Sequence, residues 1–171
     1  MFCSSAAEMK QRLTGATAVA LARNGAQRAL LLLGAPGVGK SATALELISR
    51  GAKLAGDDVV RLRRDSNTVW IEPPESDIIE ARGVGLIRAP IAQAAPISLA
   101  VRLSNDFPAE RPEHEMRLPP VKSYKVLGVA LPFVETKVSF TLVAALHCLL
   151  HGAVLIDPDV ESDMASRDGN G

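Results

Sequence analysis

The stretch GAPGVGKS, residues 34–41, decides how the rest of the chain is interpreted. It follows an unbroken run of four leucines, residues 30–33, and satisfies the pattern G-x-x-x-x-G-K-[ST] in full. Glycine reaches backbone conformations that other residues avoid, so successive N–H groups of such a loop can surround a phosphate. The sequence therefore predicts a phosphate-binding loop. Its predicted nucleotide-binding residues are Gly34, Ala35, Pro36, Gly37, Val38, Gly39, Lys40 and Ser41.

The segments on both sides of the loop support this prediction. The leucine run is typical of a buried strand, and residues 40–50 carry a one-sided apolar pattern that predicts a helix. The positive end of that helix would face the phosphates. Lys40 would contact the β- and γ-phosphates of ATP, and Ser41 would give a hydroxyl ligand to Mg²⁺. The loop does not choose the reaction, because kinases, motors and switches all use it.

Composition places the chain among ordinary globular proteins. It has 171 residues, of which 47% are hydrophobic, and this length favours about one domain. We assign a single domain to residues 1–156 and expect a flexible acidic tail at 157–171. The 19 basic and 19 acidic residues balance, which disfavours nucleic acid and anionic membranes as partners. The sequence shows neither a signal peptide nor a membrane-length apolar run, so the expected location is the cytoplasm.

Apolar patterns predict many strands and few helices. Asn24-Gly25 is a tight-turn signal, which predicts a hairpin between strands at 16–22 and 27–33. The other predicted elements are strands at 52–62 (broken at 56–58), 68–71, 97–103, 126–131 and 153–156, a bent strand or loop at 78–87, a surface loop at 104–120 and a helix at 135–151. This mixture predicts an α/β fold with β-rich α+β character.

Two further clusters hold candidate site residues. Gly56-Asp57-Asp58 follows the predicted helix by a path long enough to return beside the loop. A carboxylate there could take a proton from an attacking hydroxyl or orient a metal-bound water, although the same triplet is equally ordinary turn chemistry. Glu80 and Arg82 would share a face of an extended chain. They could serve Mg²⁺ and phosphate, although a surface salt pair is the plainer interpretation of these two residues alone.

Taken together, these clusters resemble the C-terminal catalytic domain of the bacterial HPr kinase/phosphorylase family. The resemblance runs through GAPGVGKSATALELISRGAKLAGDDVV (34–60) and DIIEARGVGLI (77–87), and continues more weakly through Arg117-Leu118-Pro119. It covers roughly residues 14–150 and is similar to a short form without a separate N-terminal domain. The implied fold is a P-loop NTPase-like kinase core.

The resemblance also implies an activity and roles for residues. The implied reaction is ATP- and Mg²⁺-dependent phosphorylation of a serine on an HPr-like phosphocarrier protein of a bacterial phosphotransferase system. Family members can also carry out phosphorolysis of that phosphoserine. Asp57 would be the general base, and Arg82 and Arg117 would contact phosphate or the protein substrate. The implied metal ligands are Ser41, Glu80 and Asp58. The family's oligomer is a hexamer, so self-association is expected.

Departures from the family pattern keep other functions open. Gly15 stands where the family usually has a histidine, and Pro119 stands where a glycine is typical. A regulatory ATP-binding module without catalysis is one alternative. A small-molecule kinase or NTPase is another, in which Asp157, after an apolar run, would act as a metal-binding carboxylate. His147 and His151 lie one helical turn apart and could bind a metal in principle, although helix-surface or helix-end residues are the plainer interpretation.

Overall fold

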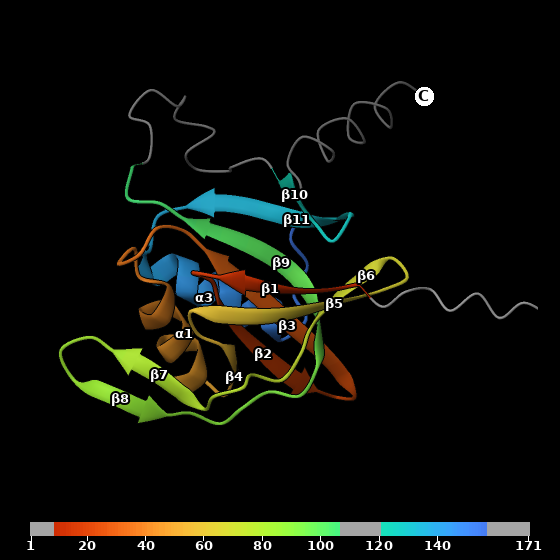
Figure 1. The fold of residues 1–171 in the computed structure, drawn as a ribbon. Helices are drawn as coiled ribbons and strands as arrows, with labels where there is room; N and C mark the ends of the chain where they lie inside the picture. The colour runs from red at the N-terminus through yellow and green to blue at the C-terminus, as the bar shows by residue number, and fades with distance from the viewer. Residues whose placement is uncertain (1–8, 107–120, 157–171) are drawn as a thin grey trace, which may run out of the picture.

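The computed structural model describes residues 9–106 and 121–156, and Figure 1 shows the arrangement of their helices and strands. The elements are β1 (Lys10–Thr14), β2 (Thr17–Arg23), β3 (Ala26–Leu33), α1 (Lys40–Ser49), β4 (Lys53–Gly56), β5 (Val59–Asp65), β6 (Thr68–Ile71), β7 (Ile78–Ala81), β8 (Gly85–Arg88), β9 (Ala95–Leu103), β10 (Lys122–Val126), β11 (Val129–Thr136) and α3 (Phe140–Leu150). Among these described elements, neither helix is long and apolar enough to cross a bilayer.

The first hairpin is the one that the Asn-Gly signal predicts. β2 and β3 pair antiparallel, and Asn24 and Gly25 both have positive φ, 51° and 75°. Two such residues in succession match the right-handed twist of the flanking strands. The hairpin turns the chain so that β3 ends at Leu33, directly before the phosphate loop.

Most strands of the described region join one large sheet. Nine strands take part, with the central order β1-β5-β6-β9-β3-β2-β4. β9 lies parallel to β3 and also to β11, which in turn pairs with β10. The carboxyl ends of β3 and β9 are therefore neighbours, and ligands of α/β proteins commonly bind outside such strand ends.

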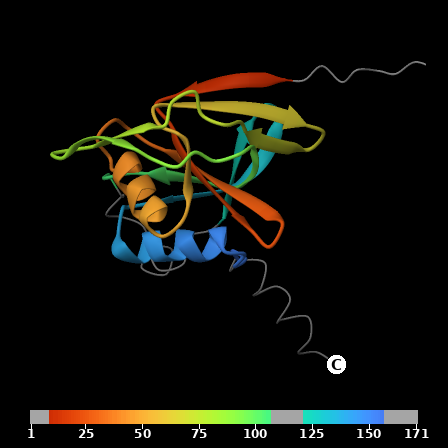
Figure 2. The same ribbon diagram turned by 90° about the horizontal axis from the view of Figure 1, so that it is seen from below.

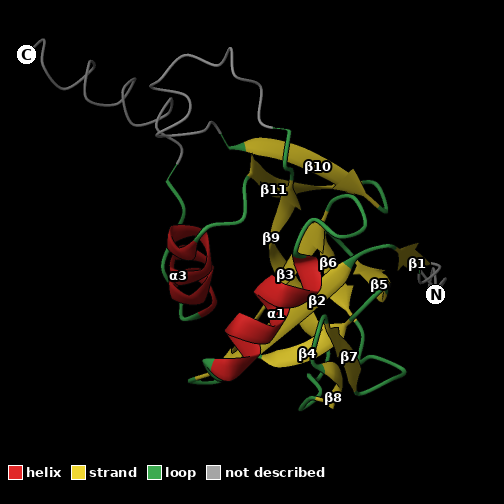
Figure 3. Cartoon of the chain, turned by 90° about the vertical axis from the view of Figure 1, so that its left-hand side faces the viewer, coloured by secondary structure: helices red, strands yellow, loops and turns green. Residues whose placement is uncertain are grey.

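Two apolar clusters lie on opposite faces of the central strands. Leu30 and Leu32 belong to the cluster covered by α1 and α3, whereas Leu31 and Leu33 belong to the cluster covered by β5, β6 and β10. Side chains alternate between faces along a strand, so a run of four leucines is buried only where both faces are covered. Figures 2 and 3 show the helices gathered on one side of the sheet.

Some sequence-based boundaries were wrong. Residues 126–131 do not form one strand, because Leu127 and Gly128 form the turn between β10 and β11, with φ of 49° and 75°. The predicted helix at 135–151 begins only at Phe140, after Ser139, whose hydroxyl oxygen accepts a 3.0 Å hydrogen bond from Leu142 N–H. Residues 135 and 136 instead extend β11.

Two other predicted segments also differ. Residues 78–87 belong to a hairpin, β7–β8, and not to one bent strand. Residues 153–156 form no strand, and Val154 and Ile156 are exposed. The greater part of the predicted loop 104–120 and the predicted tail 157–171 lie outside the described residues.

Candidate active site

The phosphate loop joins β3 to α1 at the carboxyl end of the central strands. Gly34, Gly37 and Gly39 have positive φ of 134°, 78° and 109°. Gly34 also needs the absence of a side chain, since a Cβ there would lie 2.3 Å from the carbonyl oxygen of Leu103. Each glycine of the motif is therefore required either by its positive φ or by the lack of space for a side chain.

Lys40, the first residue of α1, is buried against this loop. The residue is only 9% exposed, and Nζ donates hydrogen bonds of 2.8 Å to the Gly34 carbonyl and 3.0 Å to the Ala35 carbonyl. The ammonium group is thus held over the loop by backbone dipoles. A cation beside the N-terminus of a helix makes this place suitable for an anion.

Asp57 is connected directly to the loop. Its Oδ1 accepts a 2.9 Å hydrogen bond from Ser41 Oγ and a 2.8 Å hydrogen bond from Thr17 Oγ1. No hydrogen bond found among the described residues reaches Oδ2. One carboxylate oxygen is therefore held in place, while the other remains available to a ligand.

Asp58 has a different environment. It is exposed, adopts φ of +63°, and its carbonyl oxygen accepts a 2.6 Å hydrogen bond from Gly15 N–H. Asp and Asn tolerate this left-handed conformation better than most residues. Of the two predicted carboxylates, the structure therefore brings Asp57 to Ser41, and Asp58 shapes the turn.

A cavity of about 500 Å³ opens on the side of the loop that faces α1. Its walls contain Lys40, Ser41, Glu80 and Arg82, so the phosphate loop and the cluster of Glu80 and Arg82 meet here. We call it the helix-side cavity. The prediction that Glu80 and Arg82 share a strand face was wrong, because Glu80 lies on β7 whereas Arg82 lies in the β7–β8 turn. The Arg82 guanidinium lies beside the loop, since a Cβ on Gly37 would be 3.6 Å from Arg82 Nη1.

A second cavity of about 510 Å³ opens on the other side of the loop. We call it the strand-side cavity. Its walls include Gly15, Gly34, Arg102 and Tyr124. Arg102 and Thr17 were not predicted as site residues. A hydroxyl inside the apolar stretch ATAVALA was the available signal for Thr17, because buried hydroxyls usually have a partner.

The residues present fit a magnesium ion. Mg²⁺ is usually bound through one or two carboxylates together with phosphates and waters. Ser41 Oγ is 2.9 Å from Asp57 Oδ1, and Glu80 shares the helix-side cavity with Ser41. Within 9–106 and 121–156 no three His, Cys, Asp or Glu residues form a metal-binding group. A preformed transition-metal site is therefore not found in that part of the chain.

The remaining candidates are placed as follows. Arg117 and Asp157 lie outside the described residues. His147 and His151 are neighbours, with ring centroids 4.3 Å apart, but His151 Nδ1 is hydrogen-bonded by Arg23 Nη1. An arginine cannot ligate a metal, and no further His, Cys, Asp or Glu of the described chain joins the pair. The helix-surface interpretation is the better one for these histidines.

The fold and the loop define a sheet-dominated, mixed α/β protein with a phosphate-binding-loop motif. Comparison with known families is more specific. The model of the HPr Serine kinase C-terminal domain family matches residues 25–146, so the chain belongs to this family.

Individual relatives agree with this assignment. The HPr kinase/phosphorylases of Streptococcus pneumoniae strains Hungary19A-6 and ATCC BAA-255 / R6 are each 40% identical to the chain over 86 residues, which cover 44% of this chain and 28% of the relative. The matched part thus spans little more than a quarter of these curated relatives. The structure of the Hpr(Ser) kinase/phosphatase from Coxiella burnetii matches with a TM-score of 0.63 and 23% identity, covering 82% of this chain and 94% of that chain. At this identity the match shows the fold.

Proposed function

We propose that the chain is an ATP-dependent protein serine kinase that acts on an HPr-like phosphocarrier protein of a bacterial phosphotransferase system. The observation that carries the proposal is the pair of hydrogen bonds that hold one oxygen of Asp57 at the phosphate loop, from Ser41 and Thr17. A kinase needs a carboxylate beside the transferred phosphoryl group to accept the proton of the attacking hydroxyl. Family membership and the names of the relatives support the substrate class.

The nucleotide would bind through the loop. Backbone N–H groups of residues 34–41 and the Lys40 ammonium would surround its phosphates, and Arg82 would approach from the β7–β8 turn. Ser41 and Glu80 would hold Mg²⁺, with Asp58 as a further candidate ligand. When bound, the ion would neutralise charge on the β- and γ-phosphates.

The acceptor serine would be deprotonated by Asp57. Oδ2 takes the hydroxyl proton while the serine oxygen forms a bond to the γ-phosphorus, and the bond from that phosphorus to the bridging oxygen of ADP breaks. The hydrogen bonds from Thr17 and Ser41 keep the carboxylate oriented through Oδ1. In phosphorolysis an oxygen of inorganic phosphate would form a bond to the phosphorus of the phosphoserine while the bond from that phosphorus to the serine oxygen breaks, and the protonated carboxyl group of Asp57 would give its proton to the serine oxygen. Arg117 would assist on the substrate side, as the family resemblance suggests.

A regulatory ATP-binding module is the second candidate. The observation that favours it is Gly15, which lines the strand-side cavity without a side chain, where the family usually has a histidine. Loss of that imidazole would remove a group able to tune Asp57 or bind phosphate. Such a module would bind ATP without transferring phosphate.

One experiment separates the two candidates. The purified chain is incubated with γ-labelled ATP, Mg²⁺ and the HPr-like carrier of the same organism, and the carrier is tested for phosphoserine. We expect label with the wild type and with Asp65→Asn, an exposed aspartate at the end of β5, but none with Asp57→Asn. ATP binding should persist in all three. Absence of label with wild-type protein that still binds ATP would favour the module.

The oligomeric state of the protein and its location in the cell are proposed from the resemblance to the family. We propose a homo-hexamer in the cytoplasm, and light scattering after size-exclusion chromatography measures the mass of the particle. The mass of one chain, 18.1 kDa, is easily distinguished from that of six.

A further inference from the structure

The phosphate loop separates two cavities that carry different chemistry. The helix-side cavity contains Lys40, Ser41 and Arg82, which suit the phosphates of a nucleotide. The strand-side cavity begins at Gly34 and Ala35 and extends to Thr14 and Gly15. Transfer of a phosphoryl group is roughly in line, so the acceptor must approach from the side opposite the leaving group. A nucleotide in the helix-side cavity leaves the strand-side cavity for the acceptor.

The proposed base is close to the strand-side cavity. Gly15, in its wall, donates a 2.6 Å hydrogen bond to the carbonyl of Asp58, the residue after Asp57. Thr17, two residues after Gly15, donates to Asp57 itself. The turn between β1 and β2 therefore connects this cavity to the carboxylate that would activate the acceptor.

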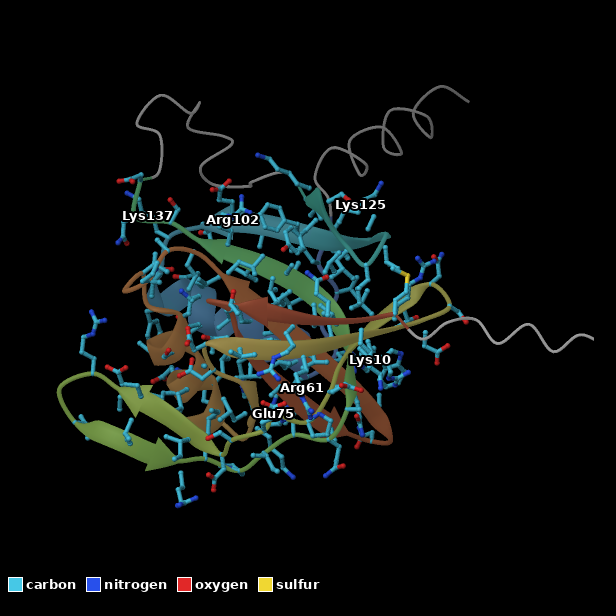
Figure 4. The ribbon with its side chains drawn as sticks, in the orientation of Figure 1. Lys10, Arg61, Glu75, Arg102, Lys125 and Lys137 are labelled. Carbon is cyan, nitrogen blue, oxygen red and sulfur yellow. The ribbon has the colours of Figure 1, made fainter. Side chains whose placement is uncertain are left out.

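Arg102 brings a cation to the same cavity. It lies at the carboxyl end of β9, in register with Leu33 of the parallel strand β3, so it stands beside the start of the phosphate loop. Figure 4 shows Arg102 on β9, on the side of the sheet near β11. None of the ion pairs found within the described residues includes Arg102. Among the residues that line this cavity, the acidic one is Asp106, and its side chain is exposed to solvent.

The guanidinium of Arg102 lies over the ring of Phe133. Its Cζ lies 5.2 Å from the centroid of the Phe133 ring, and that ring stacks on Tyr124 with centroids 5.8 Å apart. Phe133 is buried, so the ring that contacts Arg102 is held in place by packing. A contact between the cation and the face of the ring uses none of the guanidinium N–H donors as a hydrogen bond, so these donors can bind a carboxylate or phosphate with two parallel hydrogen bonds.

We propose that Arg102 is a substrate-recognition residue, which binds an anionic group of the carrier segment that presents the target serine in the strand-side cavity. The inference rests on the proposed kinase function and assigns it an acceptor side. The anionic group is either a carboxylate near the serine or the phosphate of the phosphoserine product, since a guanidinium recognises both in the same way.

The test compares Arg102→Ala and Arg102→Lys with Lys125→Ala. Lys125 is an exposed cation on β10, which β11 separates from β9, and it does not line the cavity. For Arg102→Ala we expect the KM for the carrier to rise about tenfold or more, because a charge-assisted hydrogen bond is lost. The KM for ATP should change less than about twofold, as for a remote surface charge. Arg102→Lys should be intermediate, because lysine keeps the charge but loses the planar fork.

Binding of the unphosphorylated and the phosphorylated carrier, measured by calorimetry, distinguishes the two sources of charge. Weaker binding of both forms by Arg102→Ala indicates a carboxylate, and weaker binding of the phosphorylated form alone indicates the phosphate. Thermal unfolding of each variant separates a lost contact from a damaged fold, since a merely structural residue would not change one KM selectively.

Other outcomes overturn the inference. An unchanged carrier KM in an active Arg102→Ala enzyme excludes the recognition role while the kinase proposal stands. A raised KM for ATP alone would place the nucleotide in the strand-side cavity. If the wild type transfers no phosphate to the carrier, the proposed function fails first, and the inference fails with it.

Discussion

Ser41 Oγ and Asp57 Oδ1 are 2.9 Å apart although 16 residues separate them in the sequence. The contact exists because β4 runs antiparallel to β2, with Gly56 paired to Ala18. The turn after β4 therefore ends beside both the first residues of β2 and the first turn of α1. This places the proposed base next to the phosphate loop and next to Thr17, whose hydroxyl completes the arrangement.

Thr17→Val is predicted to lower kcat for phosphoryl transfer about tenfold, as expected for one lost hydrogen bond to a charged group. Thr17 is buried, 1% exposed, and valine has almost the same shape. Asp57 would keep its contact with Ser41 but lose the 2.8 Å bond that fixes its orientation. The KM for ATP should be unchanged. Steady-state kinetics with the carrier measures both constants.

Thr43→Val is the matched control for this substitution. Thr43 is also a buried threonine, 2% exposed, but its hydroxyl has no hydrogen-bond partner within the described residues. Its replacement should leave kcat unchanged and should not lower the stability of the fold, since no hydrogen bond is lost. Equal kinetic losses in the two variants would mean that Thr17 acts only through packing.

Parts of this site could be predicted from the sequence because their chemistry is local. The loop of residues 34–41 is defined by glycines and a lysine at fixed spacing, and the turn at Asn24-Gly25 by two residues that tolerate positive φ. The approach of the Gly56-Asp57 turn to the loop also followed from chain length, since one helix and one strand suffice for the return. These features depend on few long-range contacts.

Other features depend on tertiary pairing and left no comparable local signal. Thr17 meets Asp57 across 40 residues, and Arg102 reaches the loop only because β9 pairs with β3. The backbone of Leu127 adopts a φ of 49°, which residues of its kind rarely do, so the apolar pattern of residues 126–131 predicts one strand where the chain turns. Glu80 and Arg82 line one cavity with residues of the loop, but a hairpin turn, and not the predicted shared strand face, brings Arg82 there.

Arg82→Ala is predicted to weaken ATP binding about tenfold or more, because a charge-assisted contact to phosphate is lost. Arg88→Ala provides the comparison, since Arg88 lies on the same hairpin but is paired with Asp77, 2.8 Å away, outside the helix-side cavity. It should change ATP affinity by less than about twofold. Titration of a fluorescent ATP analogue measures both. Comparable weakening in the two variants would assign the effect to the hairpin as a whole.

Gly34→Ala is predicted to destabilise the fold by about 3 kcal/mol or more, a loss typical of a steric conflict at a strained backbone position. The added Cβ would lie 2.3 Å from the backbone oxygen of Leu103, which cannot move away without disturbing β9. Gly25→Ala measures the loss of stability that comes from the positive φ alone, without a steric conflict. Gly25 has φ of 75° but open space around it, so its cost should be only about 1–2 kcal/mol. Denaturant unfolding compares the two, and equal losses would contradict the steric argument.

The contact between β2 and the end of α3 is predicted to make stability depend on pH. Burial, followed by the charges of His147 and Arg23, lowers the pKa of His151 below its usual 6.5. The neutral ring accepts a hydrogen bond from Arg23 at Nδ1, which a proton on that nitrogen would remove. Between the lowered pKa and 6.5 the unfolded chain binds more protons than the folded one, so stability is complete above 6.5 and falls as the pH decreases through this window.

His151→Gln should remove this part of the pH dependence, and Arg23→Gln should raise the pKa of His151 because a neighbouring positive charge disappears. Denaturant unfolding of the wild type and His151→Gln at about pH 7.5 and pH 5.5 brackets the ordinary titration of histidine. NMR titration of the ring protons locates the midpoint of His151 directly. A midpoint at or above 6.5 in the wild type, or the same loss of stability on acidification in His151→Gln, would assign the effect to other groups.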